Sequence, residues 1–545
     1  MSTLWNTAEK RKQLLCKLVN WKSGTLTKGE VEFAQHLAEE LGKLPYFHEH
    51  PEQLMLKDVD RGRSNVLALY KHPGVTETVV LISHYDTVPT EEYGDLEPLA
   101  CKPVELTEAM HSVKDELDDA AREDLESGDY LFGRGTMDMK AGLALHMGLI
   151  EKASTEQWPI NLLLMSVADE EVNSAGMRYG VNELLELEKE FDLTYTLFLN
   201  SEPVFAMAPQ DQAHYIYTGS IGKIMPAALF YGKETHVGEP LSGITSSYMS
   251  TYLTHRMEWN DTFRETSYGE TTPLPVTAMQ RDLKNSYSAQ TPYRTSAMYN
   301  VFTFKQSEEE VFARFEKVAR DAAAHCMEDY RAMCAREGIS PVGDIRVMRY
   351  EELRQYAIDK FGYDYVDELL AETMLHAEWD VREKSIHMAD ILLINCQELT
   401  PAITLLFAPP YYPAVNSTDD PLIQQCVESV IASASELFDI NIQQVHYFNG
   451  ISDLSYVNYH DQEDGWITYE RNTPIYGETY SIPFQTMKQL KAPVFNVGPF
   501  GKDAHKRTER LHMRNAFEEM PVLLEQLIRG LEKEEIPAER TPHGQ

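Results

Sequence analysis

The chain has 545 residues, of which 43% are hydrophobic and 25% charged, so it is too long for one hydrophobic core and has the composition of a globular protein. Its 86 acidic and 49 basic residues give a formal net charge of -37, which argues against nucleic acid or an anionic membrane surface as a partner. The six cysteines are scattered without a CxxC pair, which argues against a disulfide framework and a thiolate zinc site.

The N-terminal region is predicted to be helical. The first residues run into an amphipathic helix over 8–21 without the apolar core of a signal peptide. Thr27, with Glu30 three positions later, predicts a capping box that opens a second helix ending near Leu44. No run of about 18 apolar residues occurs. We therefore expect a cytoplasmic protein that does not cross a membrane.

Three predicted strands are each followed by side chains that can bind a metal. These are the strand at 78–82 with His84 and Asp86, the strand at 160–167 with Glu170 and Glu171, and the strand at 193–199 with Glu202. Residues two apart on an extended backbone point to the same side, so Asp86 can orient the His84 imidazole toward a metal. Strands that end in acids, with helices between them, predict an α/β sheet with a site at its carboxyl edge.

The segments between and after these strands contain a charged stretch and two more candidate metal ligands. Residues 105–129 are rich in Asp and Glu and predict a solvated surface helix. Asp138 stands just before an apolar helix predicted over 140–153, and His505 follows a strand predicted over 492–497. From about residue 213 the pattern changes to that of a β-α-β-β-α-β-like module with insertions.

The candidates together suit a metal centre of nitrogen and oxygen ligands, typical of zinc, cobalt or manganese. The five candidate ligands are His84, Asp138, Glu171, Glu202 and His505. Five ligands exceed the needs of one four-coordinate zinc, but they suit two ions that share a bridging carboxylate. Glu170, beside a ligand, is placed to take the proton of an attacking water and to pass it to a leaving amine.

Five segments that contain these residues resemble, in order, the motifs of the M20 metallopeptidase family. They are 83–89 (SHYDTVP), 133–142 (GRGTMDMKAG), 169–171 (DEE), 201–203 (SEP) and 504–509 (AHKRTE). The resemblance covers roughly residues 8–205 and 420–530. It implies a zinc-peptidase-like α/β catalytic domain, a mixed sheet flanked by helices, with an inserted α+β lid or dimerisation domain. The chain would then divide into a catalytic domain over 1–212 and 403–545 and a lid over 213–402.

The resemblance also implies roles for individual residues. His84, Asp138 and Glu202 would hold one divalent ion, and Asp138, Glu171 and His505 a second, with zinc expected and cobalt or manganese as alternatives. Asp86 would orient His84, and Glu170 would be the general acid and base.

Three further residues, His236, Asp453 and Glu509, are candidates for supporting roles. Residues 232–240 resemble a Gly-x-x-x-His-x-x-x-Pro segment, in which His236 would reach the active site of a partner in a homodimer and stabilise the oxyanion. The alternative for His236 is a plain loop residue. For Glu509 the alternatives are a surface acid and a residue that supports the site, and for Asp453 they are a turn or cap and such a supporting residue.

The resemblance is strongest to the bacterial arginine-utilisation branch of the family, in arginine, citrulline and ornithine catabolism. It implies a metal-dependent hydrolase that cleaves a C–N amide or ureido bond of a small N-acyl or N-carbamoyl amino acid or a short peptide. The alternatives are a di- or tripeptidase or aminoacylase on the same scaffold, and an inactive metal-binding regulatory protein. The lid, near 190 residues, is longer than usual and has only a loose counterpart of the family's substrate-binding stretch at 300–305, so the substrate stays open.

Overall fold

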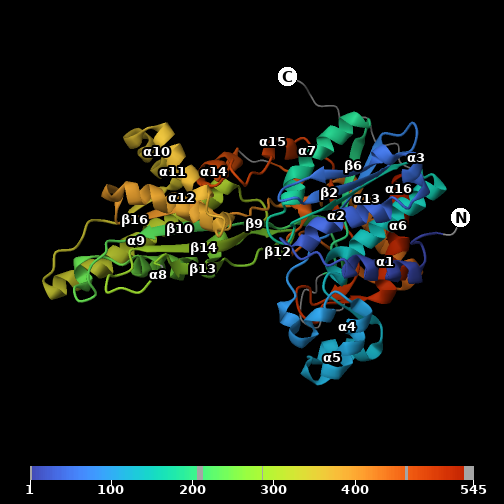
Figure 1. Ribbon diagram of the computed structural model, residues 1–545, viewed down its shortest axis with the longest axis horizontal. Helices are drawn as coiled ribbons and strands as arrows, with labels where there is room; N and C mark the ends of the chain where they lie inside the picture. Colours follow the sequence, from blue (N-terminus) through green and yellow to red (C-terminus); the bar gives the residue numbers. More distant parts are fainter. Residues whose placement is uncertain (1–2, 205–210, 212, 285, 461–463, 533–545) are drawn as a thin grey trace. The chain divides into compact units, whose positions relative to one another are not determined.

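The computed structural model describes residues 3–532, except 205–210, 212, 285 and 461–463 (Figure 1). The chain forms two compact units. The first consists of residues 1–220, 415–459 and 485–545, and the second of residues 221–414 and 460–484. None of the described helices is long and apolar enough to cross a membrane.

The first unit contains an eight-stranded mixed sheet. In spatial order its strands are β1 (Leu54–Asp58), β2 (Ser64–Tyr70), β5 (Asn161–Val167), β3 (Glu77–His84), β6 (Thr194–Asn200), β19 (Val494–Asn496), β7 (His214–Tyr217) and β18 (Ile442–Val445). The central run from β5 through β3 and β6 to β19 is parallel, whereas β1–β2, β2–β5 and β19–β7 pair antiparallel. Seven of the eight residues of β3 are buried, as expected for a parallel strand covered on both faces.

Helices flank this sheet. They are α1 (Ala8–Asn20), α2 (Lys28–Leu41), α3 (Pro45–Glu49), α6 (Ala141–Glu156), α7 (Ala175–Glu190), α13 (Pro421–Phe438) and α16 (Met520–Leu531). Residues of α1, α2, α6, α13 and α16 share one hydrophobic cluster with the strands, including Leu81 and Leu164 at its centre, and α7 packs against β2 and β5. The fold class is therefore the mixed sheet flanked by helices that the sequence predicts.

The start of α2 differs from the prediction. The Thr27 hydroxyl donates to the carbonyl of Gly24 instead of capping the helix, and the Glu30 carboxylate accepts from the backbone N–H of Leu26. The predicted capping box is therefore wrong, because Glu30 is turned inward to pair with Arg63. The helix ends at Leu41 and not near Leu44.

A helical insertion lies between β3 and β4 (Tyr130–Phe132). It contains the 3-10 turns η2 (Glu91–Leu99) and η3 (His111–Glu116) and the helices α4 (Pro103–Met110) and α5 (Asp119–Ser127). We call residues 91–129 the acidic insertion. It is not one solvated helix, because Leu106, Met110 and Leu125 are buried in a cluster with Phe132 and Phe500. A small antiparallel sheet joins β4 to β21 (Arg510–His512) and β21 to β20 (Gly501–Lys502).

The second unit is an α+β unit around a six-stranded sheet. The strands are β13 (Val276–Asp282), β14 (Arg294–Thr303), β10 (Pro226–Tyr231), β16 (Ala402–Phe407) and β15 (Arg346–Arg349) in spatial order, with β9 (Gly222–Ile224) also paired to β14. The helices are α8 (Ser246–Met257), α9 (Glu308–Glu337), α10 (Tyr350–Phe361), α11 (Tyr363–Met374), α12 (Val381–Asn395) and α14 (Gly465–Asn472).

The unit boundaries differ from the predicted 212 and 402. β7 pairs with β18 and so belongs to the first unit, whereas β16 lies inside the second sheet, between β10 and β15. Residues 460–484 join the second unit because α14 packs on α9 and β16. Strand pairing between distant segments decides these boundaries, and it leaves no local signal in the sequence.

Candidate metal centre

The parallel strands bring the predicted site residues to one edge of the first sheet. In the register of β3 with β5, His84 lies opposite Val167, and in the register with β6, Ile82 lies opposite Asn200. The chain therefore leaves β5 toward Glu170 and leaves β6 toward Glu202 beside the end of β3. This is the carboxyl edge at which ligands bind in open α/β sheets.

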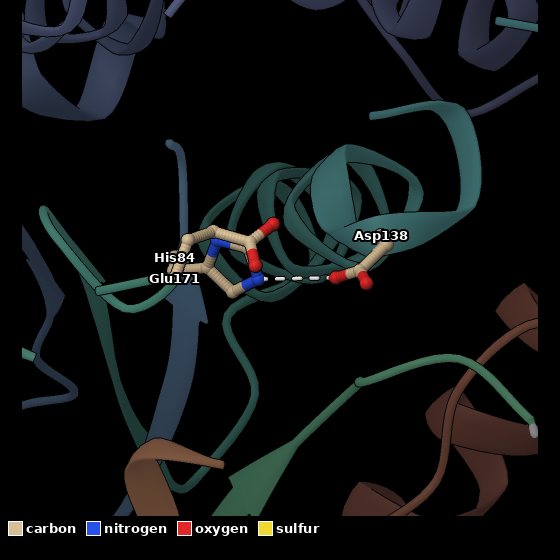
Figure 2. A group of neighbouring side chains, drawn as sticks. All are labelled: His84, Asp138 and Glu171. Carbon is tan, nitrogen blue, oxygen red and sulfur yellow. Dashed lines mark hydrogen bonds and ion pairs between the residues drawn. The ribbon is translucent and has the colours of Figure 1, made fainter. Parts of the chain in front are cut away.

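Asp138 lies between two imidazoles. Its Oδ1 is 3.2 Å from His84 Nε2, a contact that Figure 2 marks with a dashed line, and its Oδ2 is 3.1 Å from His505 Nε2. His505 Nε2 is also 3.1 Å from Glu171 Oε2, and His84 Nε2 is 3.5 Å from Glu202 Oε1. The structure thus brings all five predicted ligands together. The Asp138 carboxylate presents one oxygen to His84 and the other to His505.

Burying this group of charged acids raises the free energy of the folded chain unless a cation compensates their charge. His84, Asp138, Glu170 and Glu202 are all buried, and Glu171 is nearly so. Burial raises the pKa of Glu202 well above its ordinary value, and the charge of Asp138 raises it further against the opposing effect of His84. Burial likewise raises the pKa of Glu170. Crowded buried carboxylates are stabilised by protons or by a metal ion.

The two imidazoles hold Asp138 in its charged form. Burial opposes the charge, but hydrogen bonds from His505 and His84 outweigh it and keep the pKa of Asp138 below its usual range. The same carboxylates, Asp138 and Glu171, raise the pKa of His505 to about 11. The donor set of imidazole nitrogens and carboxylate oxygens, with ligand atoms of His84, Asp138 and Glu171 all within 4.8 Å of one another, fits zinc, cobalt or manganese.

Asp86 contacts both His84 and the loop that carries the acids. His84 Nδ1 lies 3.1 Å from the Asp86 carbonyl oxygen and 3.5 Å from its carboxylate. The carboxylate accepts hydrogen bonds from the backbone N–H groups of Glu170, at 3.0 Å, and Glu171, at 3.3 Å. Asp86 can therefore orient the imidazole and place two acids at the same time.

A buried arginine, which the sequence analysis missed, supports the same loop. Arg63 Nη1 lies 2.7 Å from Asp169 Oδ1 and 3.1 Å from Glu30 Oε1, and its Nε donates to Asp60. Asp169 precedes Glu170 and has a φ of +67°, a conformation that the surroundings must hold. Glu30 and Asp169 are far from Arg63 in sequence, so no spacing rule indicates that these three residues meet.

Removing the Arg63 charge is expected to destabilise the first unit. Arg63→Met leaves the buried carboxylates of Glu30 and Asp169 without their cation, at a cost of about 3 kcal/mol in the free energy of unfolding. Chemical denaturation would measure this as a lower transition midpoint. Arg61→Met, at an exposed neighbouring position, is the matched control and should change the free energy by less than about 0.5 kcal/mol. Equal midpoints for the two variants would contradict the role of the network.

A second buried ion pair joins the segments that carry Asp138 and His505. Arg134 Nη1 lies 2.5 Å from Glu509 Oε2, and the other Glu509 oxygen accepts from the backbone N–H of Met137. Burial raises the pKa of Glu509 to about 7 despite the opposing effect of Arg134. Glu509 is fully buried, so the alternative of a surface acid is wrong.

Asp453 and His236 are two further candidates from the sequence. Asp453 begins the short 3-10 turn η8 (Asp453–Tyr456), is buried, and has its pKa raised by burial to about 7. Its charge raises the pKa of Glu170 and Glu202, so it is electrostatically part of the site. His236 lies in the second unit on an exposed loop, where its Nδ1 accepts from the backbone N–H of Gly238. Its role at a partner's active site stays a prediction.

Comparison with known proteins identifies a family and relatives of this chain. The model of "Peptidase family M20/M25/M40" matches residues 80–463. YqjN of Bacillus subtilis (strain 168) is 41% identical over 536 residues, covering 97% of this chain and 98% of YqjN. RocB of the same organism is 30% identical over 548 residues, covering 96% of this chain and 94% of RocB.

A solved structure shows the same fold. The M20 family metallo-carboxypeptidase Sso-CP2 from Sulfolobus solfataricus superimposes with a TM-score of 0.55 at 13% identity, covering 95% of this chain and 98% of that one. The predicted fold class and the resemblance to the family are therefore confirmed. The chain belongs to peptidase family M20/M25/M40 and is a hydrolase of the M20 metallopeptidase type.

Proposed function

We propose that the protein hydrolyses a C–N amide or ureido bond of a small N-acyl or N-carbamoyl amino acid or a short peptide. The observation that carries this proposal is the position of Asp138, which presents one carboxylate oxygen to His84 and the other to His505. Such an arrangement suits two divalent ions, most simply zinc, that share one carboxylate. His84 and Glu202 would complete one set of ligands, and Glu171 and His505 the other.

When bound, such a pair of ions lowers the pKa of a shared water and withdraws electrons from the carbonyl of the substrate. The chain's own contribution to the chemistry is proton transfer. Glu170 lies beside the ligand Glu171, with its carboxyl 4.0 Å from His84 Nε2. We assign to it the uptake of a proton from the attacking water and its delivery to the leaving nitrogen. Asp86 holds the backbone of Glu170 in place for that transfer.

The proposed substrate class rests on the resemblance of the sequence to the arginine-utilisation branch, and the 30% identity with RocB over nearly the whole chain is compatible with it. We place the reaction in the catabolism of arginine, citrulline or ornithine, in the cytoplasm. A di- or tripeptidase or an aminoacylase on the same scaffold is the alternative. An inactive metal-binding protein is disfavoured because Glu170 and all five ligands are present and close together.

A small substrate panel tests the proposal. The protein is stripped with a chelator, reloaded with Zn²⁺, Co²⁺ or Mn²⁺, and incubated with citrulline, acetylornithine and unblocked di- and tripeptides. Release of ammonia from citrulline or of ornithine from acetylornithine is expected, with no turnover in the stripped protein. Turnover of peptides alone, with a requirement for a free α-amino group, would support the peptidase alternative over an N-acyl or N-carbamoyl amino acid as substrate. No turnover of any of these with any of the metals would contradict the proposed function.

A further inference from the structure

The loop that carries His505 is held in an uncommon conformation. It joins β20 to β21, and His505 and Asp503 have φ values of +65° and +61°. Residues other than glycine rarely adopt such values unless neighbouring contacts impose them. The His505 side chain is also 49% exposed, so core packing is not what places its Nε2 3.1 Å from Asp138 and Glu171.

One carboxylate of the acidic insertion contacts both strands that flank this loop. Asp124, on α5, accepts from Lys502 Nζ on β20 at 2.8 Å and from Arg510 Nε on β21 at 2.7 Å. The side chains of Asp124 and Lys502 are only 13% and 11% exposed. A charge pair that is largely shielded from water is screened less than a surface pair and holds its geometry better.

Arg510 carries this contact into the loop itself. The guanidinium is 1% exposed, and its Nη1 donates to Asp503 Oδ2 at 2.5 Å and to the Thr508 carbonyl at 3.0 Å. Asp503 also accepts from the Thr508 hydroxyl at 2.9 Å. The guanidinium therefore links the acidic insertion to the residues on both sides of His505.

We propose that Asp124 is a positioning residue through which the acidic insertion sets the conformation of the His505 loop. The inference rests on the proposed function, because it concerns the ion that His505 would bind. The contact of Asp124 with Lys502 and Arg510 would increase the affinity of the site for that ion. A loop that is already held in the binding conformation loses less entropy on binding an ion than a loose loop does, so it binds the ion more tightly. Loss of an outer contact of a metal ligand typically weakens metal affinity 10- to 100-fold.

Zinc titration of the stripped protein tests the proposal. Asp124→Asn keeps the shape but removes the charge that Lys502 and Arg510 contact, and we expect one of two Zn²⁺ ions to bind about 10- to 100-fold more weakly in competition with a chromophoric chelator. His505→Ala, which removes the ligand itself, identifies that ion. Asp119→Asn on the same helix is the control, because this 88% exposed carboxylate pairs only locally with Arg122 and should leave both affinities unchanged.

A second variant and a second measurement separate positioning from a general loss of stability. Lys502→Met removes one contact of Asp124 but leaves Arg510 paired with Asp503, and it should weaken the same ion by a smaller factor. In the metal-free protein, amide hydrogen exchange of residues 503–509 should be faster in both variants, with exchange in the central strands unchanged. Wild-type affinities and exchange rates in both variants would overturn the proposal. A wild-type protein that binds fewer than two ions would instead contradict the proposed function.

Discussion

Glu170→Gln is expected to lower kcat by about 10³-fold and to leave the metal content unchanged. The amide keeps nearly the shape of the carboxyl group but cannot take a proton from water. Glu170 also lies beside the predicted ligands and is not one of them, with its carboxyl 4.0 Å from His84 Nε2. Turnover of the best substrate, together with metal analysis by mass spectrometry, gives both quantities on one sample.

A control variant and the metal content make this result specific to proton transfer. Glu186→Gln, at an exposed position of α7, introduces the same change away from the site and should retain full activity. A Glu170→Gln protein with normal turnover would refute the assigned role. A Glu170→Gln protein that has lost an ion would also refute it, because Glu170 would then act as a ligand.

Asp138→Asn is expected to abolish activity by removing both ions. Its two carboxylate oxygens face His84 and His505 separately, so one substitution weakens both halves of the centre. An amide is neutral and presents only one oxygen, whereas a shared ligand needs two. Metal analysis after dialysis should therefore find less than one ion per chain, against two in the wild type.

Substitutions of residues that would bind only one of the two ions serve as the comparison for Asp138→Asn. Glu202→Ala removes a carboxylate that lies 3.5 Å from His84, and His505→Ala removes an imidazole that contacts Asp138 and Glu171. Each should leave one ion bound. If Asp138→Asn also retained one ion after dialysis, the shared position of Asp138 would be disproved. Circular dichroism of each variant verifies that the fold is unchanged.

The site was largely predictable because its signals are local. A buried strand followed by His84 and Asp86, and another followed by Glu170 and Glu171, can be recognised within ten residues of sequence. Parallel strands then bring their carboxyl ends together without further information. The same reasoning located Asp138 before α6, since an acidic residue ahead of an apolar helix is conspicuous.

The supporting contacts were not predictable in this way. Arg63 meets Glu30 and Asp169, and Asp124 meets Arg510, across 33 to 386 positions of sequence. In the sequence the acidic insertion looks like a solvated surface, yet Asp124 is mostly shielded by its two cationic partners. A charged side chain gives no sign of whether its partner is water or a distant arginine.

The sequence by itself determined the family, the fold class and the residues that converge at the carboxyl edge of the sheet, because these depend on periodicity and on motifs in order. Tertiary structure decided which segments form each unit, as in the assignment of residues 460–484 to the second unit. It also decided which charges are buried, and so which acids support the His505 loop. The physical reason is that strand pairing and ion pairing join residues through space, and their energies depend on burial that only the folded chain creates.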